Sequence, residues 1–309
     1  MIRFILKRML MMIPILLGVA FIIFTITSLT PGDPGTLILG PYADEASIHA
    51  LNEKLGFNDP FLIRFGKYVV HAVTGDFGVS YRTSRPVFEE IFAKMPLTLQ
   101  LVLISQVFSV FIGIPLGVMS AVKQYSALDF TTTFFSLLFA SIPSFWLAFM
   151  AIMQFSVKLK WFPVSGAEDM RGLVLPCLIL GLSGAATLAR LVRSTMLEVI
   201  RQDYITTARA KGTKERLVIF AHALRNALIP IVTVVGIGFA AGLGGSVLIE
   251  TVFGLPGVGA VMVNAIQMKD IPVVMAGVLL LATIFSVTNL LVDLLYGFID
   301  PRIKAKYKN

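Results

Sequence analysis

Charged residues are scarce in this chain of 309 residues, because Asp, Glu, Lys and Arg together make up only 14% of it. A soluble domain carries about 25% charged residues and about 45–50% apolar ones. Here 56% of the residues are hydrophobic and the mean hydropathy is +0.84. So few charges cannot cover a water-exposed surface. The composition excludes an ordinary soluble protein and indicates an integral membrane protein.

Cysteine and the motifs of catalysis are also missing or rare. The single cysteine, Cys177, excludes an intrachain disulfide and a cysteine-based metal cluster, and its apolar surroundings predict a small buried residue. No G-x-x-x-x-G-K-[ST] string is present, so the chain is not expected to bind nucleotide phosphates in a P-loop. Neither H-E-x-x-H nor G-x-S-x-G occurs, which leaves an intramembrane protease without support.

Long apolar runs are what the sequence does have. A helix needs about 20 mostly apolar residues to cross a bilayer, and six runs reach or approach this length: 9–30, 97–122, 131–157, 173–195, 228–247 and 273–296. We predict that each forms a transmembrane helix. The first is too long in its apolar core for a cleaved signal peptide, and no small-x-small site follows it.

The distribution of basic residues predicts the orientation in the membrane. With the N-terminus in the cytoplasm, 16 of the 26 Lys and Arg residues fall inside and four in the short outer loops. The other six lie in the long segment 31–96, whose charge has little influence on topology. Both ends are therefore predicted to face the cytoplasm. The net charge of +8 is first this orientation signal, and only second a sign of contact with anionic lipids or partners.

The long outer segment shows two apolar stripes at helical spacing. The first consists of Ile48, Leu51 and Leu55, and Gly56 stands where its helix would end. The second follows Asp59 as N-cap and Pro60 as first helical residue, and consists of Leu62, Phe65, Val69 and Val73, with Gly75 at its end. We expect two short amphipathic helices, which either lie over the outer mouth of a pathway or simply pack on the bundle.

Glycine is concentrated in the fifth span, where residues 236–245 contain five glycines. The pairs Gly113/Gly117 and Gly238/Gly242 have the small-xxx-small spacing that lets helices pack closely. Gly238, Gly242 and Gly245 are candidates for lining a pore or a dimer seam. Gly257 and Gly259, in a Gly/Pro turn after the span, are candidates for a re-entrant or gate-proximal outer loop, or for an ordinary tight turn.

Ionisable residues inside the spans are few. Arg190 and Arg193 lie at the predicted inner end of the fourth span, and Asp293 near the inner end of the sixth. Snorkelling or a structural ion pair explains them more simply than a proton relay. The chain therefore shows no energy source of its own for transport.

The inner loop 196–228 reads as two short helices that carry charge on one face and join at Gly212. Glycine provides there a backbone conformation that most residues resist. Such an elbow is either a solvated loop or a feature that another protein grips.

This loop resembles the EAA loop of permease subunits of ATP-binding-cassette importers, whose pattern is E-A-A, three residues, Gly, nine residues and I-x-L-P. With Gly212 on the family's glycine, Ala208 and Leu224 also match, whereas Thr206 and Arg225 replace the Glu and the Pro. The strings 207–212 and 222–227 resemble the peptide-permease branch. Further strings resemble the B-type dipeptide/oligopeptide permease of this branch, and they occur in the same order: 3–8, 31–34, 75–80, 250–259, 289–296 and 300–302.

The resemblance implies an all-α, six-transmembrane-helix permease of a type I ABC importer, with a helical extracytoplasmic segment after the first helix. Its parts would be the cytoplasmic N-terminus with the first transmembrane helix (1–30), the extracytoplasmic helical loop (31–96), the permease core of helices two to six (97–297) and a cytoplasmic tail (298–309). The core would include the coupling loop 196–228. The residues implied at or beside the ATPase groove are Asp203, Ala208, Arg209, Lys211, Gly212, Lys214, Glu215 and Arg216. Arg209 and Lys211 have lipid headgroups as an alternative contact.

The implied partners are a C-type permease subunit, one or two cytoplasmic P-loop ATPases and an extracytoplasmic solute-binding protein. ATP and Mg²⁺ would be bound by the ATPases, which would hydrolyse the ATP. This chain would be a non-catalytic transport subunit and would bind no cofactor or nucleic acid. The implied location is the cytoplasmic (inner) membrane of a bacterium or archaeon. Alternatives are a permease of the same fold for nickel, a metal chelate, glutathione or an antimicrobial peptide, and a stand-alone carrier or membrane enzyme.

Overall fold

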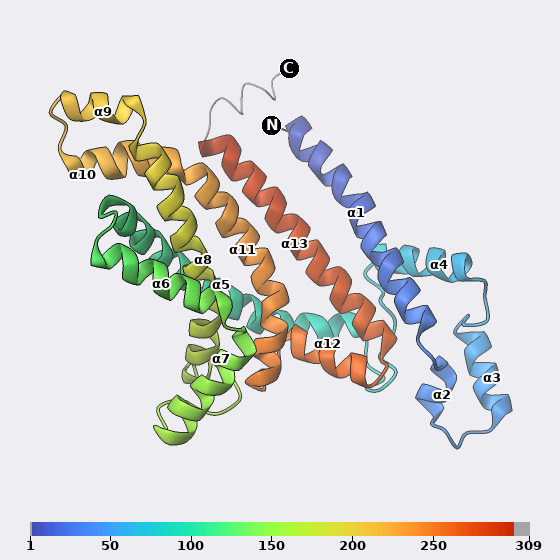
Figure 1. Ribbon diagram of the computed structural model, residues 1–309. Helices are drawn as coiled ribbons and strands as arrows, with labels where there is room; N and C mark the ends of the chain where they lie inside the picture. The colour runs from blue at the N-terminus through green and yellow to red at the C-terminus, as the bar shows by residue number, and fades with distance from the viewer. Residues whose placement is uncertain (1, 300–309) are drawn as a thin grey trace. The chain divides into compact units, whose positions relative to one another are not determined.

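The computed structural model describes residues 2–299, and this part of the chain is helical from α1 (Ile2–Leu29) to α13 (Ile271–Ile299) (Figure 1). Its one extended pairing is an isolated antiparallel bridge between Val79 and Pro86. The chain divides into two compact units. Among the described residues, the first unit holds Leu99–Leu255 and Val287–Ile299, and the second holds Ile2–Thr98 and Pro256–Ser286. The all-α prediction is confirmed.

Five helical stretches are long and apolar enough to cross a membrane: α1, α5 (Val87–Val122), α8 (Arg171–Ile200), the continuous stretch Glu215–Val252 that ends with α11 (Arg225–Val252), and α13. A sixth span is obtained if one sharply bent pair of helices counts as a single crossing. The basic tail residues Arg302, Lys304, Lys306 and Lys308, and the string 300–302, lie outside the described residues.

The bent pair corrects the prediction of an unbroken third span over 131–157. The structure has α6 (Ala127–Ser141), then α7 (Ser144–Ala151) continuing into the π-helical η1 (Ile152–Lys158), with a bend of 99° between them. Pro143 lies in the break, directly before α7, and has no backbone N–H to donate. It also keeps the preceding Ile142 extended, at φ −78° and ψ 127°. The helix therefore ends at Ser141, two residues before the proline.

The second span is longer than predicted. Helix α5 has 36 residues and begins at Val87, so the predicted boundary between Pro96 and Leu97 falls inside it. At 1.5 Å per residue the helix is about 54 Å long, well beyond the roughly 30 Å of a hydrocarbon core. Apolar composition marks only the membrane-immersed part of such a helix, which explains the misplaced boundary.

Close packing of α5 on α8 organises the first unit. A Cβ atom at Gly113 would lie 2.9 Å from the carbonyl oxygen of Ala185, and one at Gly117 would lie 2.6 Å from that of Ala189. Only glycine fits at such distances from another backbone. The predicted packing role of the Gly113/Gly117 pair is confirmed.

In the second unit, three short helices follow α1: α2 (Pro34–Leu39), α3 (Glu45–Lys54) and α4 (Phe61–Val73). The two predicted amphipathic helices correspond to α3 and α4, whereas α2 was not predicted. The carboxylate of Asp33 caps α2 by accepting the backbone N–H of Thr36 at 2.9 Å. The Asn52 amide donates to the same carboxylate at 2.6 Å and lowers the pKa of Asp33.

Asp59 was expected to cap α4, and this prediction is wrong. The N-cap position is Pro60, and the Asp59 carboxylate instead pairs with the ammonium group of Lys67 at 2.6 Å. Helix α4 packs on α1 through aromatic rings: the ring centroids of Phe61 and Phe65 lie 5.3 and 5.5 Å from that of Phe24. Of the two alternatives for the amphipathic helices, this contact favours packing on the membrane-spanning helices in the case of α4.

Candidate functional site

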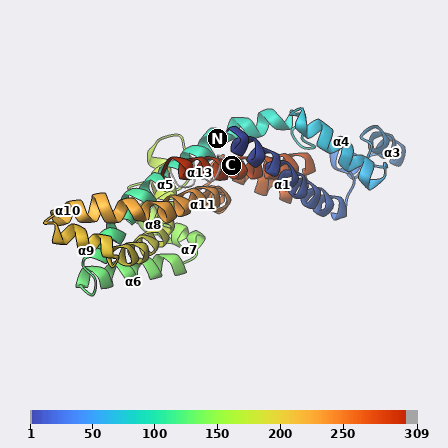
Figure 2. The same cartoon turned by 90° about the horizontal axis from the view of Figure 1, so that it is seen from above.

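The elbow consists of α9 (Asp203–Ala210), a turn at Gly212 and α10 (Glu215–Leu217), which continues through the π-helical η2 (Val218–Leu224) into α11. Helices α9 and α10 lie side by side in both views of the chain (Figures 1 and 2). Gly212 has φ +77°, and nothing lies within 4 Å of where its Cβ would be. The backbone conformation, rather than lack of space, therefore requires glycine there. The predicted two helices joined at Gly212 are confirmed.

The inner face of the elbow is anchored in a hydrophobic cluster. Ile205 of α9 is fully buried, as are Val218 and Ala223 of the returning helix. They pack with residues of α5, α8, η2 and α11, namely Val118, Ala121, Leu188, Val192, Met196, Ile219, Ala227 and Ile231. Ala208 lies half-buried against the same cluster. Buried side chains of this kind are closely packed, so the elbow is held firmly on the ends of α8 and α11.

The outer face of the elbow is charged. Asp203, Lys211, Lys214 and Arg216 are exposed, and no ion pair joins them to other described residues. Arg209 and Glu215 form a two-pronged pair across the turn, at 3.1 Å from Nε to Oε2 and 2.7 Å for the second contact. This hydrogen bonding to Glu215 raises the pKa of Arg209. The sequence suggested both residues as separate docking charges, and the structure brings them together.

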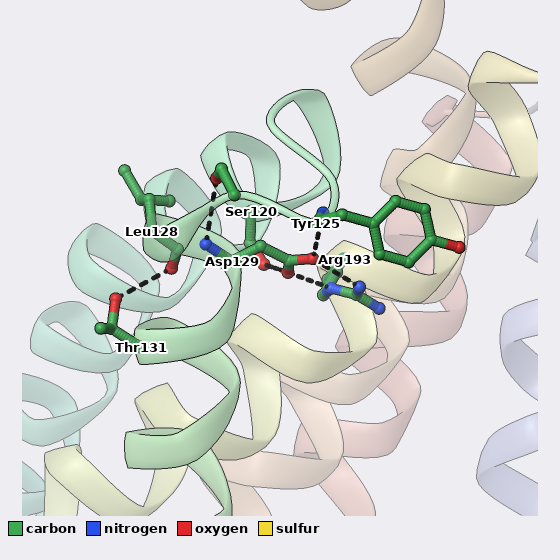
Figure 3. Close-up of polar contacts among 7 residues, drawn as sticks. Ser120, Tyr125, Leu128, Asp129, Thr131 and Arg193 are labelled. Atoms are coloured by element: carbon green, nitrogen blue, oxygen red, sulfur yellow. Dashed lines mark hydrogen bonds and ion pairs between the residues drawn. The ribbon is translucent and has the colours of Figure 1, made fainter.

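A partly buried ion pair holds α6 against α8 close to the elbow (Figure 3). The guanidinium of Arg193 donates to the Asp129 carboxylate through Nε at 2.5 Å and through a terminal nitrogen at 2.8 Å. The Ser120 hydroxyl and the backbone N–H of Tyr125 donate to the same carboxylate, at 2.5 and 3.0 Å. Arg193 thus forms the structural ion pair that the sequence favoured over a relay. Sequence reasoning missed Asp129, whose only local signal was Ser126, the N-cap of α6.

A cavity of about 340 Å³ lies between α5, α8 and α11 in the first unit. Gly238 and Gly242 line it, and a Cβ at Gly238 would come within 3.3 Å of the Gln106 amide oxygen. Gly245 is not part of the lining, and a Cβ there would lie 3.3 Å from a methyl group of Leu180. Sequence reasoning missed Gln106, which lines the cavity together with serine, threonine, glycine and aliphatic residues.

The turn after the fifth span leads into a short helix, α12 (Val258–Gln267). Gly257 is its N-cap, with φ −91°, and Gly259 is buried in its first turn. The positive φ of the turn, +60°, belongs instead to Gly254. The backbone N–H of Val258 donates to the Thr98 hydroxyl at 2.9 Å. A special backbone conformation is therefore found at a glycine that sequence reasoning did not select.

Metal-binding groups do not cluster in the described part of the chain: no three His, Cys, Asp or Glu side chains between residues 2 and 299 are placed to hold an ion together.

Comparison with known protein families assigns the chain to a family of transport proteins. Residues 113–305 match the model of the binding-protein-dependent transport system inner membrane component, and residues 1–102 match the model of the N-terminal region of such membrane components. The chain belongs to this family. Its fold is that of the membrane permease of a type I ABC importer.

Relatives match over nearly the full length. The dipeptide transport system permease protein DppB of Alkalihalophilus pseudofirmus is 40% identical, over 98% of this chain and 100% of its own. The oligopeptide transport system permease protein AppB of Bacillus subtilis is 43% identical, over 97% and 99%. The glutathione transport system permease protein GsiC of Escherichia coli K12 is 40% identical, over 99% and 100%.

A solved structure supports the fold alone. A chain of the MetNI methionine ABC transporter in an inward-facing conformation superimposes with a TM-score of 0.57 at 21% identity. The superposition covers 68% of this chain and 96% of that one.

Proposed function

We propose that this chain is the B-type permease subunit of an ATP-driven importer and forms, with a C-type permease subunit, the path for dipeptides and oligopeptides. An extracytoplasmic solute-binding protein would deliver the cargo. Two relatives named for dipeptide and oligopeptide transport, 40% and 43% identical over nearly the full length, support this cargo. ATP and Mg²⁺ would be bound by one or two separate P-loop ATPases, and this chain would carry no cofactor and catalyse no reaction.

The elbow is the observation that carries the proposal. Its inner face is packed on α8 and α11 through Ile205. Because this contact is close-packed, a displacement of α9 would be transmitted to those two helices. Both helices also line the cavity that contains Gly238 and Gly242. Closure of an ATPase beneath the elbow would therefore reshape the path. This is a rigid-body switch between two packings.

The exposed charges of the elbow are the proposed contacts with the ATPase. Asp203, Lys211, Lys214 and Arg216 are exposed and form no ion pair with other described residues. Ala208 and Gly212 would shape the docking surface, and the Arg209–Glu215 pair would hold the turn in place. The proposed gate contribution of Gly257 and Gly259 rests on their burial beside the turn after α11.

The proposed orientation places both chain ends and the elbow in the cytoplasm and segment 31–96 outside. It is supported by the 16 basic residues on the inner side against four in the short outer loops. The chain would then lie in the cytoplasmic membrane of a bacterium or archaeon, with the bilayer and its protein partners, and no nucleic acid, as its surroundings.

Charge reversal tests the docking surface. Lys211→Glu, Lys214→Glu and Arg216→Glu together break no ion pair of the fold, because these exposed side chains pair with no described residue. We expect the triple variant to insert normally but to lose the co-purifying ATPase and peptide uptake. Reversing Arg85 and Lys158, two exposed basic residues outside the elbow, is the control. Full uptake and ATPase retention in the triple variant would place the docking surface elsewhere.

Glutathione is a second candidate cargo, because the glutathione permease relative is 40% identical over the whole of its length. Uptake of labelled dipeptide, pentapeptide and glutathione can be compared in cells that lack other peptide importers and carry the complete transport system. We expect saturable uptake of the peptides, with weaker competition from glutathione. Uptake of glutathione alone would favour the second candidate.

A further inference from the structure

The second unit contains a cavity of about 430 Å³ where α4 packs on the end of α1. Its apolar wall includes Phe24, Phe57 and Met275, and its polar wall includes Arg64, Tyr68 and Tyr81. No part of the proposed transport mechanism uses this cavity, because the elbow and the cavity lined by Gly238 belong to the other unit.

Arg64 brings a positive charge to the cavity that no carboxylate of the described residues neutralises. Its guanidinium lies over the rings of Phe57 and Phe24, at 4.5 and 5.7 Å from the ring centroids. Three other basic side chains line the cavity. Lys67 pairs with Asp59 at 2.6 Å and the His71 ring contacts the Asp76 carboxylate at 3.2 Å, whereas Lys54 adds a second positive charge that pairs with no described residue.

Tyr68 adds an unsatisfied donor. Its hydroxyl oxygen is fully enclosed and has no hydrogen-bond partner among the described residues. A buried hydroxyl without a partner is costly and rare in folded proteins. Burial raises the pKa of Tyr68, and burial together with Asp270 raises the pKa of Tyr81 to about 12. Both phenols therefore stay protonated at physiological pH, and with Arg64 they form a set of donors that calls for an anionic acceptor.

The surroundings of the cavity are apolar and uncovered. On α4, Leu62, Val70 and Val73 are 73%, 66% and 84% exposed, although the opposite face of the helix packs its aromatic rings on α1. On α1, Ile22, Ile26 and Leu29 are also exposed. A short helix that presents apolar residues beside the end of a membrane-spanning helix is typical of the lipid headgroup boundary. Aromatic and arginine side chains gather at the same depth.

We propose that this cavity binds the phosphate group of a membrane phospholipid, with the Arg64 guanidinium and the Tyr68 and Tyr81 hydroxyls as donors. The planar guanidinium suits two oxygens of one phosphate. The acyl chains would run along the exposed apolar residues of α1 and α4. The binding chemistry is independent of the proposed transport function. The proposed orientation, which puts segment 31–96 outside, would place the bound phospholipid in the outer leaflet, and only this placement rests on that proposal.

Native mass spectrometry of the full-length chain, purified with its co-assembling partners, tests the proposal. The probes are palmitoyl-oleoyl phosphatidylglycerol, diacylglycerol with the same acyl chains but no phosphate, and inorganic phosphate. We expect retention of phosphatidylglycerol, no retention of diacylglycerol and no displacement by inorganic phosphate. Equal retention of diacylglycerol would refute the phosphate contact, and displacement by inorganic phosphate would show a soluble-anion site instead.

Variants assign the contact to residues. Arg64→Gln should lower phosphatidylglycerol retention about tenfold, because a charge-assisted contact is lost, whereas Arg85→Gln, an exposed arginine outside the cavity, should leave it unchanged. Tyr68→Phe should lower it about fivefold without lowering the stability of the delipidated protein, since the hydroxyl has no protein partner to lose. If Arg64→Gln does not assemble, Tyr68→Phe alone decides. Unchanged retention of phosphatidylglycerol in Tyr68→Phe would overturn the proposal. So would a variant of either residue that loses a protein partner of the complex but retains the lipid.

Discussion

At the residue scale, Gly212 makes the elbow possible because its φ of +77° is a conformation that side chains with a Cβ resist. Gly212→Val should cost about 1–3 kcal/mol locally and loosen the turn. We expect normal membrane insertion but reduced ATPase co-purification and transport. Gly212→Asn is the control, because asparagine tolerates the left-handed region. Equal loss of transport in both variants would mean that glycine is needed for contact with a partner, not for backbone conformation.

The Asp129–Arg193 pair provides a second residue-scale prediction. The Asp129 side chain is 4% exposed and that of Arg193 is 28% exposed, so Asp129→Asn leaves a largely buried charge without its partner. We expect a loss of about 3–5 kcal/mol in unfolding free energy, seen as a lower thermal midpoint in detergent. Removing both charges, with Asp129→Asn and Arg193→Gln together, should recover part of it.

An exposed pair is the matched control for this experiment. Asp169 and Arg171 lie 3.9 Å apart with side chains 68% and 77% exposed, and Asp169→Asn should change stability by less than about 1 kcal/mol. A similar midpoint in the Asp129 and Asp169 variants would show that the Asp129–Arg193 contact does not hold α6 on α8.

At the element scale, the contact between α5 and α8 depends on Gly117. A Cβ there would lie 2.6 Å from both the Ala189 carbonyl oxygen and the Val192 Cβ. Relieving this clash requires the backbones of α5 and α8 to move apart, which costs packing energy. Gly117→Leu should therefore destabilise the first unit by about 1–3 kcal/mol or more. Gly18→Leu in α1, where nothing lies within 4 Å, should be neutral. Fluorescence-detected thermal unfolding of both variants compares them directly, and equal midpoints would contradict the close packing.

Helix ends were harder to predict than helix existence. The break before Pro143 had a signal in the sequence, but a long apolar run suggested one continuous span. The start of α5 at Val87 had only a weak signal, because residues 87–96 are helical yet not uniformly apolar. The capping of α2 by Asp33 depends partly on Asn52 of α3, so it was accessible only once the two helices were placed together.

At the scale of the whole molecule, the orientation can be tested with the chain's own cysteine content. Cys177 is the single cysteine and is buried, so it should react poorly with a membrane-impermeant maleimide, and Cys177→Ser gives a clean background. Lys67→Cys should then be labelled in intact cells, and Lys123→Cys, on the predicted inner side but outside the elbow, only after permeabilisation. Both positions are exposed, so access depends on the side of the membrane. The reverse pattern would overturn the proposed topology.

Much of this protein was readable from the sequence by itself. Membrane insertion, the number of apolar runs and the bias of basic residues follow from composition and from local order along the chain. The elbow was also accessible, because Gly212 separates two short charged helical patterns within one loop.

Only the tertiary structure decided which residues meet. Asp129 and Arg193 are 64 positions apart, and nothing in their local sequence pairs them. The same holds for Arg64 beside Phe24, and for the cavity between α5, α8 and α11. The physical reason is that hydropathy and helical periodicity are properties of neighbouring residues, whereas an ion pair or a cavity wall depends on how separate helices pack.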